Sequence, residues 1–98
     1  MSRKPRDPAW IPANYEPADV EAIKALHDGT ADSHQQRRAL NWIIETAALT
    51  YDMPFRSDAD GGERDTSFAL GRVFVGQQIV KLLKMSPQLI ATLRNKNG

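Results

Sequence analysis

One stretch of the sequence decides the fold, residues 65–84, with the sequence DTSFALGRVFVGQQIVKLLK. Wound as an α-helix at 100° per residue, it carries apolar side chains on nearly every side, and only Gln77, Lys81 and Lys84 keep a polar strip. A helix of this kind is central or lies between partners. We expect it to be the spine of the domain, packed between the other helices or covered on its second face by a neighbouring subunit.

Two helices are predicted before this spine. The first covers residues 17–28 and ends before Gly29, because glycine adopts the left-handed cap conformation at little cost. The second covers residues 33–51, where apolar residues recur at helical spacing. Ser33 followed by Gln36 indicates a capping box at its start.

The ends of the chain differ in character. Four of the six prolines fall in the first 17 residues, so residues 1–16 are predicted to be an extended arm, mobile at residues 3–6. Trp10 and Tyr15 on this arm need an apolar surface, either this domain's own core or a partner. The rest of the chain, residues 17–98, is predicted to be one helical domain.

The segment after the second helix contains two further predicted features. Residues 52–64 should form a mobile acidic loop, and a last helix begins with Ser86 as the N-cap and Pro87 in its first turn. The sequence therefore predicts an all-α fold, a small domain of three or four helices with a proline-rich N-terminal arm.

Composition excludes several classes of protein. The 98 residues carry 13 Lys and Arg against 12 Asp and Glu, and a net charge of +1 is untypical of a protein that coats nucleic acid. The absence of cysteine excludes disulfides, a thiolate nucleophile and a cysteine zinc site. No apolar run has the length of a membrane span, so we expect no membrane partner.

Charge is nevertheless uneven along the chain. Residues 73–98 contain no acid, whereas residues 57–72 contain four acids and two arginines. Unlike charges at two ends favour head-to-tail association of copies. The basic residues of the C-terminal segment are Lys81, Lys84, Arg94 and Lys96.

No motif predicts catalysis, a cofactor or a metal. Gly71 and Gly76 have the glycine spacing of a phosphate-binding loop, but the required lysine and hydroxyl do not follow. His27 and His34 lack further ligands at suitable spacing, and the acidic loop lacks the calcium-hand pattern. We expect a protein that is not an enzyme.

The spine helix contains residues with predicted structural roles. Gly71 and Gly76 each cost helix stability, which is explained if another backbone approaches closely. Arg72 lies near Phe68 among apolar residues, so its guanidinium needs a carboxylate or several carbonyls, an interface, or a path to water. The candidate carboxylates are Glu45, Asp65 and Asp52.

Residues 68–76, FALGRVFVG, fit the pattern of Phe, two residues, Gly-Arg, two residues, Val-Gly. Together with Gln36–Leu40, Trp42–Ile44 and Phe55, this pattern resembles a family of short helical proteins of tailed bacteriophages, encoded among head-assembly and packaging genes. The resemblance covers residues 34–83. It implies a non-enzymatic protein, virion-associated or a packaging accessory, found in the host cytoplasm or the virion.

Three functional hypotheses follow. The first is a phage assembly protein that acts by protein–protein contact with itself or with phage structural proteins, through Trp10, Tyr15, Lys81, Lys84 and Arg94. The second is a terminase-like packaging subunit that recognises DNA, in which the first two helices form a helix-turn-helix presenting Arg37 and Arg38. The third is a phage inhibitor that binds a host protein.

Overall fold

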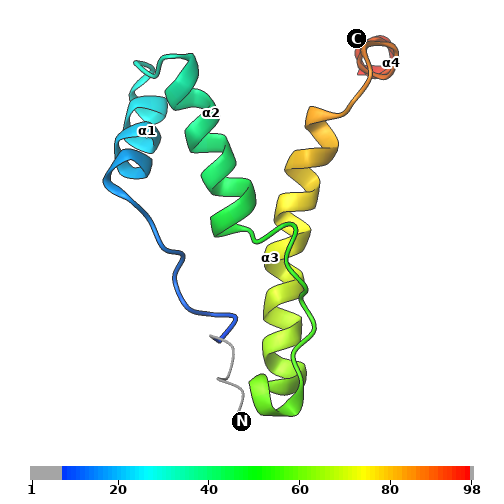
Figure 1. Cartoon of the computed structure of the whole chain (residues 1–98). Coiled ribbons are helices and arrows are strands. Elements are labelled where there is room, and N and C mark those ends of the chain that lie inside the picture. The colour runs from blue at the N-terminus through cyan, green and yellow to red at the C-terminus, as the bar shows by residue number, and fades with distance from the viewer. Residues whose placement is uncertain (1–7, 98) are drawn as a thin grey trace.

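The computed structural model describes residues 8–97, in which every regular element is a helix. The predicted mobile segment, residues 3–6, lies outside the described part of the chain. Figure 1 shows an open arrangement in which α1 and α2 form a hairpin, α3 stands beside it, and α4 is set apart. The elements are α1 (Pro17–Asp28), α2 (Ser33–Asn41), the π-helical turn η1 (Trp42–Ala47), the 3-10 turn η2 (Asp58–Asp60), α3 (Gly62–Leu83) and α4 (Pro87–Asn97).

Short-range hydrogen bonds and a glycine cap define the first helical hairpin. The Asp19 carboxylate accepts a 2.8 Å hydrogen bond from the Glu16 amide at the start of α1. Gly29 ends α1 with φ 74°, which confirms the predicted boundaries. Ala22 of α1 and Ala39 of α2 are fully buried, so the two helices pack closely through small side chains.

The second helix differs from the prediction at its start. Its N-cap is Asp32, whose carboxylate accepts from the Gln35 amide at 2.8 Å. The Gln35 side chain accepts in return from the Asp32 amide at 3.1 Å. The capping box therefore lies one residue before the predicted pair, Ser33 and Gln36, because the Asp32 carboxylate supplies the acceptor.

The predicted helix over residues 33–51 is also wrong at its end. The α-helix gives way to η1, where the Ala48 amide donates to the Ile43 carbonyl five residues back, at 2.9 Å. Leu49 then adopts φ 51°, and the Thr50 hydroxyl donates to the Ile44 carbonyl at 2.7 Å. These bonds satisfy the last carbonyls of the helix and turn the chain toward α3.

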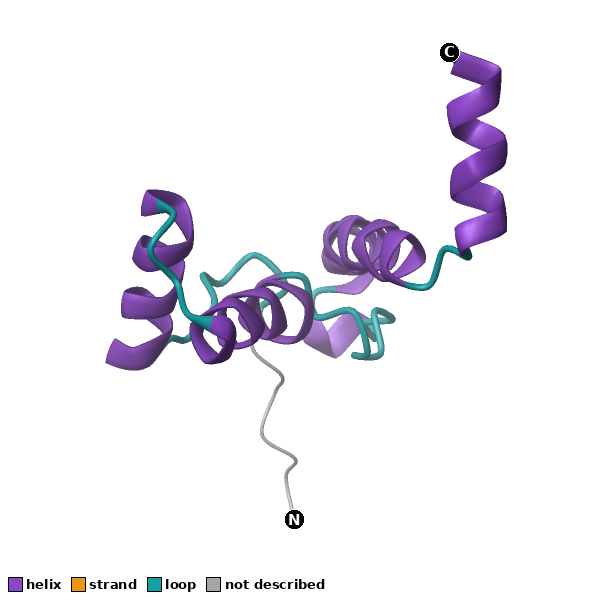
Figure 2. Cartoon of the chain, turned by 90° about the horizontal axis from the view of Figure 1, so that it is seen from above, coloured by secondary structure: helices purple, strands orange, loops and turns teal. Residues whose placement is uncertain are grey.

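α3 begins at Gly62, three residues earlier than predicted, and packs on one face only. That face carries Gly62, Asp65, Ala69, Val73 and Gly76, and it contacts η1 and η2. The expectation that the spine lies between the other helices is therefore wrong. Figure 2 shows α1 and α4 at opposite ends of the molecule, so neither encloses α3. Apolar residues on all sides indicate that a helix needs partners, but not that they lie in the same chain.

The two glycines of α3 have different surroundings. A Cβ at Gly76 would fall on the Thr50 hydroxyl and lie 3.0 Å from the Ala48 Cβ, so a close approach is found there, made by side chains where the sequence predicts a backbone. A Cβ at Gly71 would have no heavy-atom neighbour within 4 Å. Within a single chain, the close approach predicted at Gly71 is therefore not found.

The described residues build a very small core. Five of the seven buried apolar residues are alanines, and only Ile44 and Val73 are larger. The radius of gyration is 17.3 Å, whereas a compact domain of this length has about 13 Å. Most large apolar side chains thus lie outside the core of the single chain.

Candidate interaction surface

One exposed apolar stripe runs along α3. Phe68, Val75 and Leu82 recur every seven residues and are 49%, 54% and 66% exposed. With Gly71 they lie within an arc of about 60°, on a side of the helix away from η1. We call Phe68, Gly71, Val75 and Leu82 the α3 stripe. Two more exposed apolar side chains, Leu70 and Phe74, widen this surface.

α4 presents a second uncovered apolar surface. The helix starts as predicted, with the Ser86 hydroxyl accepting from the Leu89 amide at 3.1 Å. Leu89, Ile90 and Leu93 are all exposed, and Figure 1 shows α4 standing clear of the other helices. An 11-residue helix without packing is marginal in water. Its apolar side therefore needs a partner surface.

The uneven charge predicted from the sequence appears as a gradient along α3. Lys81 and Lys84 are exposed at its C-terminal end, and Arg94 is exposed on α4. Asp58 and Glu63 are exposed at its N-terminal end, together with Arg64. The length of α3 separates these two groups by about 30 Å.

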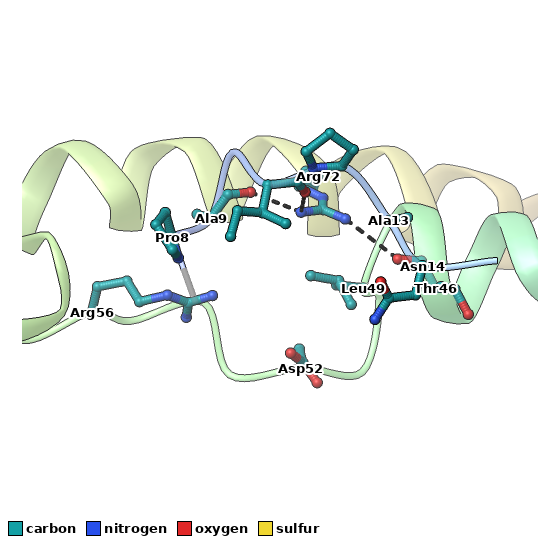
Figure 3. A pocket seen from close by; sticks show the side chains of 11 residues that line it. Pro8, Ala9, Ala13, Asn14, Thr46, Leu49, Asp52, Arg56 and Arg72 are labelled. Carbon is teal, nitrogen blue, oxygen red and sulfur yellow. Dashed lines mark hydrogen bonds between the residues drawn. The ribbon is translucent and has the colours of Figure 1, made fainter. Parts of the chain in front are cut away.

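Arg72 joins three parts of the chain. Its Nη1 donates to the Ala9 carbonyl at 2.7 Å, its Nε to the Ala47 carbonyl at 2.9 Å, and its Nη2 to the Thr46 carbonyl at 3.3 Å. A fourth, longer bond of 3.5 Å reaches the Ile11 carbonyl. Figure 3 shows this guanidinium between the arm and η1. Carbonyls, not the candidate carboxylates, are therefore the acceptors of these bonds.

The candidate carboxylates lie elsewhere in the fold. Asp65 is buried and accepts a 3.2 Å bond from the Ala9 amide, so it and Arg72 hold the same residue of the arm. Glu45 is exposed. Asp52 lines a cleft of about 340 Å³ between the arm and residues 46–56.

That cleft contains Arg56, a residue that no pattern in the sequence singles out. Its side chain is buried, and its Nη1 donates to the Met53 and Pro54 carbonyls at 2.8 and 3.3 Å. Its Nε has no acceptor among the described residues. A single arginine in a polar loop has no sequence signal that separates it from a solvated side chain. Both arginines that line the cleft already bind carbonyls, so the cleft is the junction between the arm and the loop.

The aromatic residues of the arm are exposed. Ala9 is buried, but Trp10 and Tyr15 are 62% and 70% exposed. The arm is fixed instead by Trp42, whose Nε1 donates to the Asn14 carbonyl at 2.9 Å. Packing of the two aromatic rings into this domain's own core is therefore not observed, and both rings are available to a partner.

The two arginines of the DNA-binding hypothesis differ in their contacts. Arg38 donates from Nε to the Asp19 carboxylate at 2.9 Å and from Nη2 to the Glu16 carboxylate at 3.0 Å. Arg37 is exposed. Two carboxylates beside Arg38 oppose a phosphate at that position, and Arg37 lines the same surface hollow as these two carboxylates.

Other kinds of site find no support in the described part of the chain. Residues 8–97 contain no group of three or more His, Cys, Asp or Glu side chains that could hold a metal ion. None of their helices combines the length and the apolar character needed to cross a membrane. Comparison with known proteins gives no match to a family model, to a curated protein or to a solved structure.

Proposed function

We propose that this chain is a non-enzymatic assembly protein that acts by protein–protein contact, as a homo-oligomer. The α3 stripe and the apolar side of α4 are its main contact surfaces, and the exposed Trp10 and Tyr15 add to them. The resemblance of residues 34–83 to small phage proteins supports a place among virion or head-assembly components. The protein then acts in the host cytoplasm or in the virion, together with phage structural proteins.

The observation that carries this proposal is the imbalance between buried and exposed apolar residues. Only Ile44 and Val73 among the large apolar residues are buried in residues 8–97, whereas seventeen are exposed, nine of them on α3 and α4. Full burial of one such side chain contributes about 1.5 to 3 kcal/mol. A chain that leaves so many uncovered gains more from association than from its own core.

Light scattering of the purified full chain tests the proposal. We expect a mass of at least twice the 11.0 kDa of one chain at micromolar concentration, without DNA. A cooperatively unfolding 11.0 kDa monomer that persists to about 100 µM would overturn self-association, because a functional oligomer needs a stronger contact than that. A monomer that gains mass only with DNA would favour the packaging-subunit hypothesis instead.

A further inference from the structure

We infer that α3 pairs with α3 of a second copy, antiparallel, with the two-fold axis at Val75. This inference rests on the proposed self-association and specifies its geometry. Phe68 then lies opposite the partner's Leu82, and Val75 lies opposite the partner's Val75. The α3 stripe is buried along its whole length in such a pair.

The first support is Gly71, a glycine without a role in the single chain. It lies near the middle of α3 with open space around its missing side chain, and its φ is not positive. Alanine at such a helical position is more stable by about 1 kcal/mol. A second backbone that crosses α3 beside the stripe explains glycine at Gly71, as Thr50 explains it at Gly76. In the antiparallel pair, Gly71 faces the partner's Ile79.

The second support is the area that remains uncovered. The chain exposes 7851 Å², whereas a compact protein of 11.0 kDa exposes about 5,600 Å². The excess, about 2,200 Å², is larger than the roughly 800 Å² that each partner contributes to a standard interface. A second copy on the α3 stripe covers part of this excess, and α4 and the arm remain for further contacts.

The third support is the spacing of the stripe. Phe68, Val75 and Leu82 follow a seven-residue repeat, the repeat that keeps one helix facing another along its length. Val75 is the centre of this repeat. An isologous contact places equivalent residues symmetrically about its axis, so an axis at Val75 matches both ends of the stripe.

Charge decides the direction of the pair. Arg64 is exposed and lies about 20° from Val75 on the helix surface, so a parallel pair would place it beside the partner's Arg64. An antiparallel pair about Val75 keeps the two Arg64 side chains about 30 Å apart. Like charges placed side by side in an interface are unfavourable, so charge favours the antiparallel direction.

Disulfide cross-linking tests the pairing, because the chain has no cysteine and each variant introduces a single thiol. Val75→Cys should oxidise to a covalent dimer. Phe68→Cys mixed with Leu82→Cys should form the mixed dimer, whereas Phe68→Cys alone should not. The two Phe68 positions lie about 21 Å apart in the antiparallel pair, and a disulfide needs Cα atoms within about 7 Å. Glu21→Cys, exposed on α1, is the control for random collision.

Two outcomes would overturn the pairing. If Phe68→Cys forms a covalent dimer with itself in the same yield as Val75→Cys, the pair is parallel. Val75→Cys that cross-links no better than Glu21→Cys would show that α3 is not the contact. If light scattering still shows a multimer in that case, self-association stands and only its geometry fails. Should a variant lose helical content, Gly71→Cys mixed with Ile79→Cys tests the same pairing.

Discussion

The contact between Gly76 and Thr50 is the most direct test of how α3 meets η1. In Gly76→Ala, the new methyl group would occupy the position of the Thr50 hydroxyl, which is buried and donates to the Ile44 carbonyl at 2.7 Å. Either Thr50 rotates and loses that bond, or η1 moves away from α3. We therefore expect Gly76→Ala to destabilise the fold, although alanine is the better helix former.

The magnitude follows from three opposing terms. Loss of the buried Thr50 bond costs about 1 to 3 kcal/mol, and overpacking beside Ala48 costs about 1 to 3 kcal/mol. The gain in helix propensity returns about 1 kcal/mol. The net expectation is a loss of roughly 1 to 5 kcal/mol in the free energy of unfolding, which is large for a domain of this size.

Urea unfolding followed by circular dichroism, at one fixed protein concentration, measures this loss. Gln77→Ala is the matched control, because Gln77 is the exposed neighbour on the same helix, and its effect should stay within about 0.5 kcal/mol. Thr50→Ala removes the overlapped hydroxyl, so the double variant should cost less than the two single variants together. A Gly76→Ala chain as stable as the parent would refute the close approach of η1 to α3.

Three further predictions concern single side chains. Gly71→Ala should weaken dimerisation measured by sedimentation, yet raise the free energy of unfolding of the dilute monomer by up to about 1 kcal/mol. A variant that dimerises as the parent does would show that no second helix approaches Gly71. Arg72→Lys should lower the free energy of unfolding by about 2 kcal/mol and speed proteolysis of the arm near Trp10. An ammonium group cannot reach the arm carbonyl and the η1 carbonyls together, and an unchanged cleavage rate would contradict this. Arg38→Ala should lower the unfolding free energy of the α1–α2 hairpin by about 1 to 2 kcal/mol while Arg37→Ala has little effect, and equal losses would show that the ion pairs of Arg38 do not contribute.

Much of the local structure could be predicted from the sequence, because it depends on neighbours in the chain. The boundaries of α1 follow from a proline in the first turn and from Gly29, and α4 starts at its Ser-Pro cap. The end of the second helix could not be predicted. Its π-helical turn forms where Thr50 donates to the Ile44 carbonyl and packs on Gly76 of α3, and Gly76 is far from Thr50 in sequence.

The sequence alone determined that the chain is all-α, that one nearly all-round apolar helix dominates it, and that Arg72 lies on that helix among apolar residues. Only the tertiary structure decided which surfaces cover that helix and which atoms accept the hydrogen bonds of Arg72. An apolar surface needs another apolar surface, and a guanidinium needs hydrogen-bond acceptors, whatever their position in the chain. Which partner each group finds depends on contacts between residues that are distant in sequence. The carbonyls of Ala9 and Ala47 accept hydrogen bonds from Arg72, whereas the α3 stripe stays exposed within residues 8–97.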